Sequence, residues 1–173
     1  MTGGLNEKTV EKYSVKNDRW CRGPDLSIER MCHASCCLNG TVYLFCGVSS
    51  VLAEIDTIEK LSGAATLTPE SEWEQIVMPV SILGKQWPIV APLNSKEILI
   101  MGGTSLDIAD PANKARVTIY NLRLQTSRTV LTAQHEISSI CNQSASQVPN
   151  EVVALVRFAS DDPVLVKYSK FTN

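Results

Sequence analysis

The stretch that decides the fold begins with Pro24-Asp25-Leu26-Ser27-Ile28-Glu29-Arg30 and continues at residues 38–43 with Leu38-Asn39-Gly40-Thr41-Val42-Tyr43. A second stretch matches it without gaps: Pro79-Val80-Ser81-Ile82-Leu83-Gly84-Lys85 and, at residues 93–98, Leu93-Asn94-Ser95-Lys96-Glu97-Ile98. The same number of residues separates Pro24 from Gly47 and Pro79 from Gly102. Turn residues thus fall on turn residues, which indicates an internal repeat.

Each repeat divides into short predicted strands. Asn39-Gly40 is the strongest short hairpin signal, and it joins a predicted strand at His33–Leu38 to one at Thr41–Phe45. The other strands that the pattern predicts are Thr9–Ser14, Trp20-Cys21, Ile55–Leu61, Trp73–Val77, Pro88–Leu93, Glu97–Met101, Arg116–Asn121, Ser127–Leu131, Ile137–Asn142, Val152–Phe158 and Val164–Ser169.

This strand rhythm predicts the fold class. Many short strands at fairly even spacing, without a long capped amphipathic helix, are typical of an all-β sandwich, barrel or propeller. A period of about 45 to 55 residues with four strands favours a propeller of four-stranded antiparallel blades. We expect a single domain, an incomplete β-propeller with blade pieces at about residues 1–22, 30–77, 87–131 and 137–169. That is two full blades with a partial blade at each end.

The composition excludes several classes of protein. The chain has 173 residues, 44% hydrophobic and 20% charged, which fits one ordinary globular domain rather than a disordered chain. The net charge of −2 lacks the basic field that general nucleic-acid or membrane-surface binding requires. No apolar run approaches the roughly 20 residues that span a bilayer, and residues 1–7 lack the features of a signal peptide. We therefore expect a cytoplasmic protein.

The six cysteines are expected to be reduced. Three of them crowd into the apolar stretch Cys32-His33-Ala34-Ser35-Cys36-Cys37 at the start of one predicted strand, where they cannot easily pair with one another. The interpretation is buried thiols that act as small hydrophobic side chains. Zinc is the alternative, but structural zinc sites usually use two separated ligand pairs, and no second pair is present. We expect no metal and no cofactor.

The sequence also resembles a known family. Gly3-Gly4, Tyr13, Trp20, Arg30, Tyr43 and Cys46-Gly47 stand as in the kelch repeat, which has a double glycine and a tyrosine about six residues before a tryptophan. In the second unit Cys46 replaces the first glycine and Leu61 takes the place of the tyrosine. The glycines are expected to supply positive φ, and Tyr13 and Trp20 to pack one blade against the next.

The resemblance implies a non-enzymatic protein–protein interaction module that acts as an adaptor or scaffold, expected to be the C-terminal part of a longer protein. The alternative is an enzyme or carbohydrate-binding propeller of the galactose-oxidase-like type. Only His33 and His135 are available for such a copper site, and the motifs G-x-S-x-G and H-E-x-x-H are absent. An incomplete ring would also leave open edges for self-association.

Two cations are the candidate partner-binding residues. Arg30 and Lys85 occupy equivalent repeat positions, each just before the first strand of a blade. The first strand of a blade is the innermost one, so both side chains are expected near one mouth of the central channel, where they would suit an acidic segment of another protein. The alternative is that Arg30 holds its own loop by bonding backbone carbonyls or Glu29.

Overall fold

The computed structural model describes residues 2–4, 6–63, 68–79, 86–103, 116–132, 137–138, 145–148, 151–158 and 164–169. These residues are all-β apart from one 3-10 turn, η1 (Val15–Asn17), which confirms the all-β part of the predicted fold class. Within the same residues, no helix is long and apolar enough to cross a membrane.

The strands form four antiparallel sheets. The first sheet contains β1 (Thr2–Gly4), β2 (Glu7–Ser14) and β3 (Arg19–Arg22), in that order. The second sheet contains β4 (Ala34–Leu38), β5 (Thr41–Phe45), β6 (Thr57–Leu61) and β7 (Glu74–Val77). The third sheet contains β8 (Ile89–Asn94), β9 (Glu97–Met101), β10 (Arg116–Asn121) and β11 (Thr126–Thr132). The fourth contains β12 (Ile137–Ser138), β13 (Ala145–Val148), β14 (Glu151–Phe158) and β15 (Val164–Ser169), with β14 paired to the other three.

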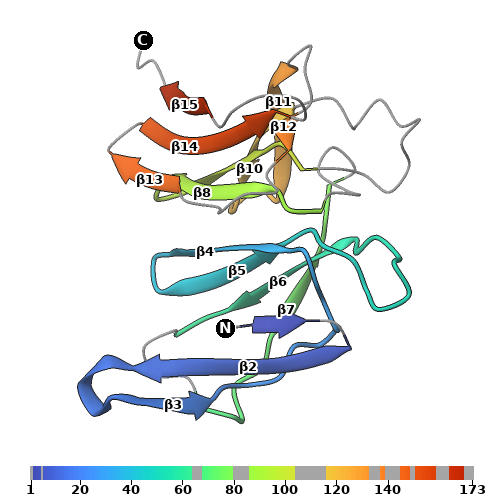
Figure 1. Cartoon of the computed structure of the whole chain (residues 1–173), viewed down its shortest axis with the longest axis vertical. Helices are drawn as coiled ribbons and strands as arrows, with labels where there is room; N and C mark the ends of the chain where they lie inside the picture. Colours follow the sequence, from blue (N-terminus) through green and yellow to red (C-terminus); the bar gives the residue numbers. More distant parts are fainter. Residues whose placement is uncertain are drawn as a thin grey trace.

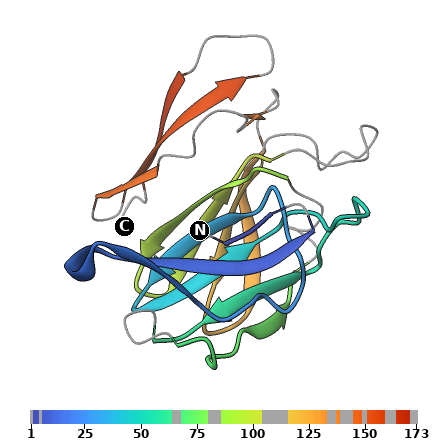
Figure 2. The same cartoon turned by 60° about the horizontal axis from the view of Figure 1, so that its bottom comes forward.

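The sheets follow one another along the longest axis of the molecule in the order of the sequence. The first sheet lies at one end and the fourth at the other (Figure 1). In a second view the first sheet comes to the front, and the orange-red strands of the fourth sheet project beyond the other three sheets (Figure 2). The described sheets make an open stack, so each sheet between the two ends has a neighbour on both faces.

Two hydrophobic clusters hold the first three sheets together. Between the first and second sheets, Val10 packs with Leu26, Leu44, Leu61 and Trp73. Between the second and third sheets, the largest members of the cluster are Phe45, Ile58, Ile98, Ile100 and Tyr120. Successive side chains of a strand point to opposite faces, so Leu44 and Phe45 can serve the two clusters from one strand.

The first strands of the second and third sheets run side by side in the same direction, and a hydrogen bond joins them at each end. Before the strands, the backbone N–H of Trp87 donates to the carbonyl of Cys32 at 2.7 Å. After them, the side-chain amide of Asn39 donates to the carbonyl of Ser95 at 2.9 Å. We call this contact the β4–β8 seam.

The structure corrects the register of the repeat after its first strand. Ala34 pairs with Phe45 in the second sheet, but Ile89 pairs with Met101 in the third, where a bulge between Pro92 and Asn94 accommodates one extra residue. The gap-free match therefore ends inside β8, at this bulge. Beyond it, Cys46-Gly47 is equivalent to Gly102-Gly103, with φ angles of 60° and 91° in one pair and 65° and 89° in the other.

The expected strand bounds are confirmed exactly for β5, β9, β10 and β15. Two strands were not expected: β1, which contains the first glycine pair, and β13, which pairs with β14. Of the expected strand Ile137–Asn142, the structure describes only Ile137–Ser138, and the rest lies outside the described residues. The expected strand Ile55–Leu61 begins later, at Thr57, because the N–H of Ile55 bonds the carbonyl of Gly47.

Candidate functional site

The candidate site is built from the segment that enters β4 and the loop that leaves β5. Met31 and Val48 exchange two backbone hydrogen bonds of 2.9 Å, and Val48 also bridges to Glu54. The N–H of Ser49 donates to the carbonyl of Ala53 at 2.9 Å. The loop is therefore a backbone-bonded turn with a fixed shape, not a loose connection.

This turn presents two large apolar side chains to solvent. Val51 is 81% exposed and Leu52 is 55% exposed, and Leu52 adopts a positive φ of 58°. Side chains as exposed as these contribute little to the core, so packing does not explain why they are apolar. The turn has a defined conformation, and exposed apolar groups on it are available to a partner.

The third sheet adds an aromatic side chain at the same end of the molecule. Trp87 precedes β8 as Cys32 precedes β4, and the two residues share an unusual backbone conformation, with φ of 50° and 58°. Trp87 is 39% exposed, and its backbone N–H bonds the carbonyl of Cys32. We call the surface formed by residues 31–33, 48–54 and 86–88 the loop face. Non-glycine residues in the left-handed region store backbone strain, which is often found at functional sites.

Acidic side chains accompany this surface. Glu29 accepts a hydrogen bond from the hydroxyl of Ser50, next to the exposed Val51. Glu54 is exposed at the end of the same turn. The described part of the loop face thus combines apolar groups with negative charge.

The structure places Arg30 inside the protein, with no exposed surface. Its Nη1 donates to the carbonyl of Cys46 at 2.8 Å, its Nη2 to the carbonyl of Thr57 at 2.9 Å, and its Nε lies 3.4 Å from Oε2 of Glu59. The alternative reading, in which Arg30 bonds backbone carbonyls, describes this arrangement, although the carbonyls belong to Cys46 and Thr57 rather than to its own loop. A buried guanidinium cannot contact a partner, and Lys85 lies outside the described residues.

Burial sets the protonation of the thiol of Cys36 and the imidazole of His33. Burial raises the pKa of Cys36 to about 12, with the neighbouring Cys37 adding to the effect. Burial and the charge of Arg30 lower the pKa of His33 to about 4. In the described parts of the chain, no three His, Cys, Asp or Glu side chains gather where they could hold a metal ion, and no disulfide bond joins Cys21, Cys32, Cys36, Cys37 or Cys46. Cys141 and His135 lie outside these parts.

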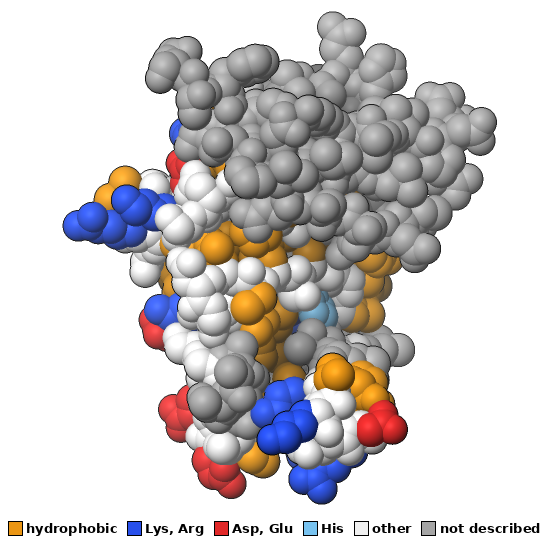
Figure 3. Space-filling view, turned by 90° about the vertical axis from the view of Figure 1, so that its left-hand side faces the viewer, with side chains coloured by type: hydrophobic (Ala, Val, Ile, Leu, Met, Phe, Trp, Pro, Cys, Tyr) orange, Lys and Arg blue, Asp and Glu red, His pale blue; other side chains and the backbone are white. Residues whose placement is uncertain are grey.

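Charged side chains mark the end of the first sheet that carries the β2–β3 turn. Basic and acidic side chains stand beside one another at the first sheet, and hydrophobic side chains show between the sheets (Figure 3). A shallow groove there is lined by Lys12, Arg19 and Arg22, among others. Arg22 is already bound to Asp25, with its Nη2 at 2.8 Å from both carboxylate oxygens. This groove is less distinctive than the loop face, because Arg22 is already paired with Asp25.

Sequence reasoning missed Val51, Leu52 and Trp87. Their signal was present, because Val51-Leu52 interrupts a loop of small and polar residues where no strand alternation requires them. No family model matches the chain, and no curated protein matches its sequence.

Proposed function

We propose that this chain is part of a kelch-type β-propeller and serves as a cytoplasmic protein-interaction module, an adaptor or scaffold that binds another protein through the loop face. The observation that carries this proposal is the exposure of Val51, Leu52 and Trp87 on a backbone-bonded surface at one end of neighbouring sheets.

The repeated geometry supports the propeller part of the proposal. The first strands of the second and third sheets lie side by side at the β4–β8 seam, as the innermost strands of adjacent blades do. The equivalent pairs Cys46-Gly47 and Gly102-Gly103 have the same φ signature, and the glycine conformation is required at the second position. A Cβ on Gly47 would lie 2.5 Å from the carbonyl oxygen of Met31, so only glycine lets the two segments exchange hydrogen bonds.

The chemistry of the loop face indicates the kind of partner. Apolar anchors flanked by Glu29 and Glu54 suit a segment with large hydrophobic side chains and basic neighbours. The acidic partner expected from the sequence depended on two cations, and one of them, Arg30, is buried. Fixed loops on a rigid sheet scaffold pre-organise such a surface and lower the entropic cost of binding.

A paired mutational comparison tests the function. Val51→Asp with Leu52→Asp removes the two anchors on the turn, while Leu124→Asp changes a side chain that is 67% exposed in the turn between β10 and β11. We expect chemical cross-linking in cell extract, read by quantitative mass spectrometry, to find proteins lost with the double variant and kept with Leu124→Asp. Identical cross-linked sets for the two variants, both folded by circular dichroism, would exclude the loop face as the binding surface.

A further inference from the structure

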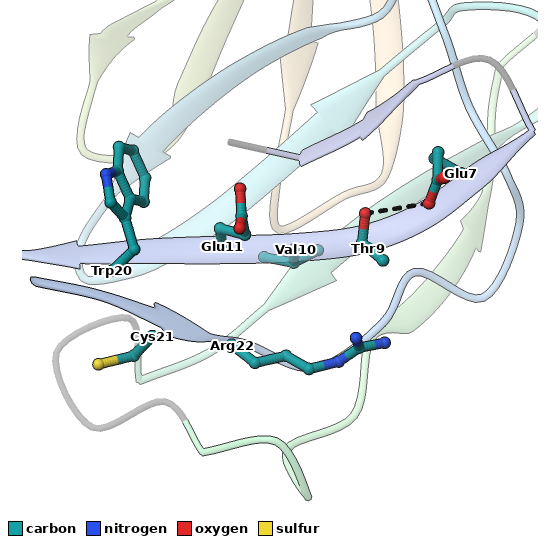
Figure 4. Close-up of a pocket in the computed structure, with 7 residues that line it drawn as sticks. All are labelled: Glu7, Thr9, Val10, Glu11, Trp20, Cys21 and Arg22. Atoms are coloured by element: carbon teal, nitrogen blue, oxygen red, sulfur yellow. Dashed lines mark hydrogen bonds between the residues drawn. The ribbon is translucent and has the colours of Figure 1, made fainter.

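The two faces of the β2–β3 hairpin carry different side chains. Trp20 and Glu11 rise from one face, and Cys21 points to the other (Figure 4). Tyr13 shares the face of Trp20; the two side chains are 43% and 60% exposed, and their ring centroids lie 5.2 Å apart. The expectation that they pack one sheet against the next is thus not met within the described residues. The face of Cys21 is the one that turns toward the second sheet, because the buried Val10 lies on it.

Three cations line a shallow groove on the face of Cys21. Lys12 pairs in register with Cys21, and Arg19 precedes Cys21 by two residues on β3, so the three side chains share this face. Arg22 also lines the groove, which has a volume of about 470 Å³. The loop between β6 and β7 contributes Thr68-Pro69 to the same lining. A threonine from a loop of the second sheet thus lines a basic groove of the first sheet.

Thr68 has the sequence and the exposure of a kinase substrate. Thr68-Pro69 is the one place in the sequence where serine or threonine precedes proline, and this dipeptide is what proline-directed protein kinases recognise. Both residues are exposed. The hydroxyl of Thr68 donates to the carboxylate of Glu70 and lowers the pKa of that group. A single hydrogen bond at the surface gives little protection against a kinase.

Ser71, three residues further on, has the opposite electrostatic surroundings. Together with Asp25, Glu70 and Glu72 it lines a separate depression. Its Oγ already accepts the backbone N–H of Thr68 at 3.2 Å, and its side chain is half-buried. A phosphate on Ser71 would meet like charges, whereas one on Thr68 would meet cations. The two hydroxyl side chains of residues 68–72 are therefore not equivalent.

We propose that Thr68 is a phosphorylation site whose phosphate binds the basic groove of Lys12, Arg19 and Arg22. A proline-directed kinase transfers the γ-phosphoryl group of ATP to Oγ1 of Thr68. The bond from the γ-phosphorus to the oxygen of the β-phosphate breaks, ADP leaves, and the hydroxyl proton passes to the carboxylate base of the kinase. The new group carries about −1.5 to −2 charges at pH 7 and three acceptor oxygens. Arginine suits it, because a guanidinium can bind two phosphate oxygens at once.

The present contacts of the groove are compatible with such a phosphate. Arg22 binds Asp25 through Nη2, and the other nitrogens of its guanidinium carry further donors. That ion pair is exposed, so it is weak and can share its cation with a phosphate. Phosphorylation also removes the hydrogen that Thr68 donates to Glu70 and places two negative groups side by side. The modified side chain therefore turns from Glu70 to the cations, which ties the β6–β7 loop to the first sheet.

Phosphorylation of the whole chain by a mitogen-activated protein kinase, followed by peptide mapping with mass spectrometry, tests the acceptor. We expect one phosphate, on Thr68, and none on the variant Thr68→Ala. The matched control is Ser71→Ala, which removes the other hydroxyl of the turn and should be modified as fully as the natural sequence. An unmodified Thr68, or a phosphate on Ser71 instead, would contradict the proposal.

Phosphorus NMR of the modified chain tests the groove. The phosphate of a phosphothreonine peptide with the sequence of residues 64–72 titrates at about pH 6, and the cations should lower that midpoint by up to about one pH unit in the folded chain. Arg19→Gln should return the midpoint most of the way to that of the peptide. Arg123→Gln, which changes another exposed arginine in the turn between β10 and β11, should leave it unchanged. A midpoint equal to that of the peptide, or equal effects of the two arginine variants, would overturn the proposal.

Discussion

The guanidinium of Arg30 and the carboxylate of Glu59 lie 3.4 Å apart, Nε to Oε2, at a place where neither side chain has any exposed surface. The other oxygen of Glu59 accepts the backbone N–H of Ser27 at 2.7 Å, while Arg30 holds the carbonyls of Cys46 and Thr57. Burial lowers the pKa of Arg30, and the charge of Glu59 opposes that shift. The pair thus connects the segment before β4, the loop after β5 and the strand β6.

Replacing one member of this pair should be severely destabilising. Arg30→Met leaves the carboxylate of Glu59 buried without its counter-charge, which we expect to lower the free energy of unfolding by about 3–5 kcal/mol. Arg22→Met breaks the solvent-exposed pair with Asp25 and should cost at most about 1 kcal/mol. Urea denaturation of the two variants measures both values, and equal costs would contradict the structural role given to Arg30.

Glycine at position 47 should be irreplaceable, whereas Gly40 should tolerate alanine better. Both adopt positive φ, 91° and 71°, so alanine strains either one by about 1–2 kcal/mol. Gly47 has an added cost, because a Cβ there meets the carbonyl oxygen of Met31 at 2.5 Å, while nothing lies within 4 Å of a Cβ on Gly40. Thermal unfolding should therefore show a clearly larger loss of stability for Gly47→Ala, and a larger loss for Gly40→Ala would refute this reading.

The stability of the protein should fall on mild acidification through His33. Its pKa is about 4 in the folded protein, against 6.5 ordinarily, because burial disfavours the charged imidazole and Arg30 repels it. Between these two values only the unfolded chain takes up the proton, so stability falls as the pH drops through this range, by at most about 3 kcal/mol. His33→Gln should flatten the pH dependence of the urea midpoint there. An unchanged slope would show that His33 is not responsible.

The thiols should react with alkylating agents in a defined order. Cys37 is exposed and should react first, whereas Cys46 is fully buried and Cys36 has its pKa raised to about 12 by burial. The thiolate is the reactive form, so the raised pKa of Cys36 should slow its modification, and Cys46 should react slowly because the reagent cannot reach it. Peptide mapping by mass spectrometry after timed labelling with iodoacetamide measures the order. Faster labelling of Cys36 than of Cys37 would contradict the arrangement of β4.

Local signals made most of the strands predictable. Asn39-Gly40 located the β4–β5 hairpin, because that dipeptide adopts the positive φ that a tight turn needs, and the structure gives φ of 52° and 71°. The extra residue in the β8–β9 hairpin was not visible, because a gap-free match still aligned turn with turn. Only strand pairing shows that Ile89 faces Met101 rather than Ile100.

The candidate site was less predictable than the strands, for a physical reason. A position before a strand does not determine whether a long side chain turns outward or inward. Arg30 turns inward because Cys46 and Thr57, far along the chain, offer carbonyls and Glu59 a charge. In contrast, the apolar character of Val51 and Leu52 was plain in the sequence, but only the turn geometry shows that they stay outside.

The β4–β8 seam, with one hydrogen bond at each end, joins the second and third sheets along their first strands. In these two sheets β7 and β11 are the strands farthest from the seam. Trp87 lies at the seam itself, whereas Val51 and Leu52 lie in the loop that leaves β5. Because backbone hydrogen bonds hold both the turn and the seam, the distance between these anchors should stay fixed, and the loop face should select partner segments of one width.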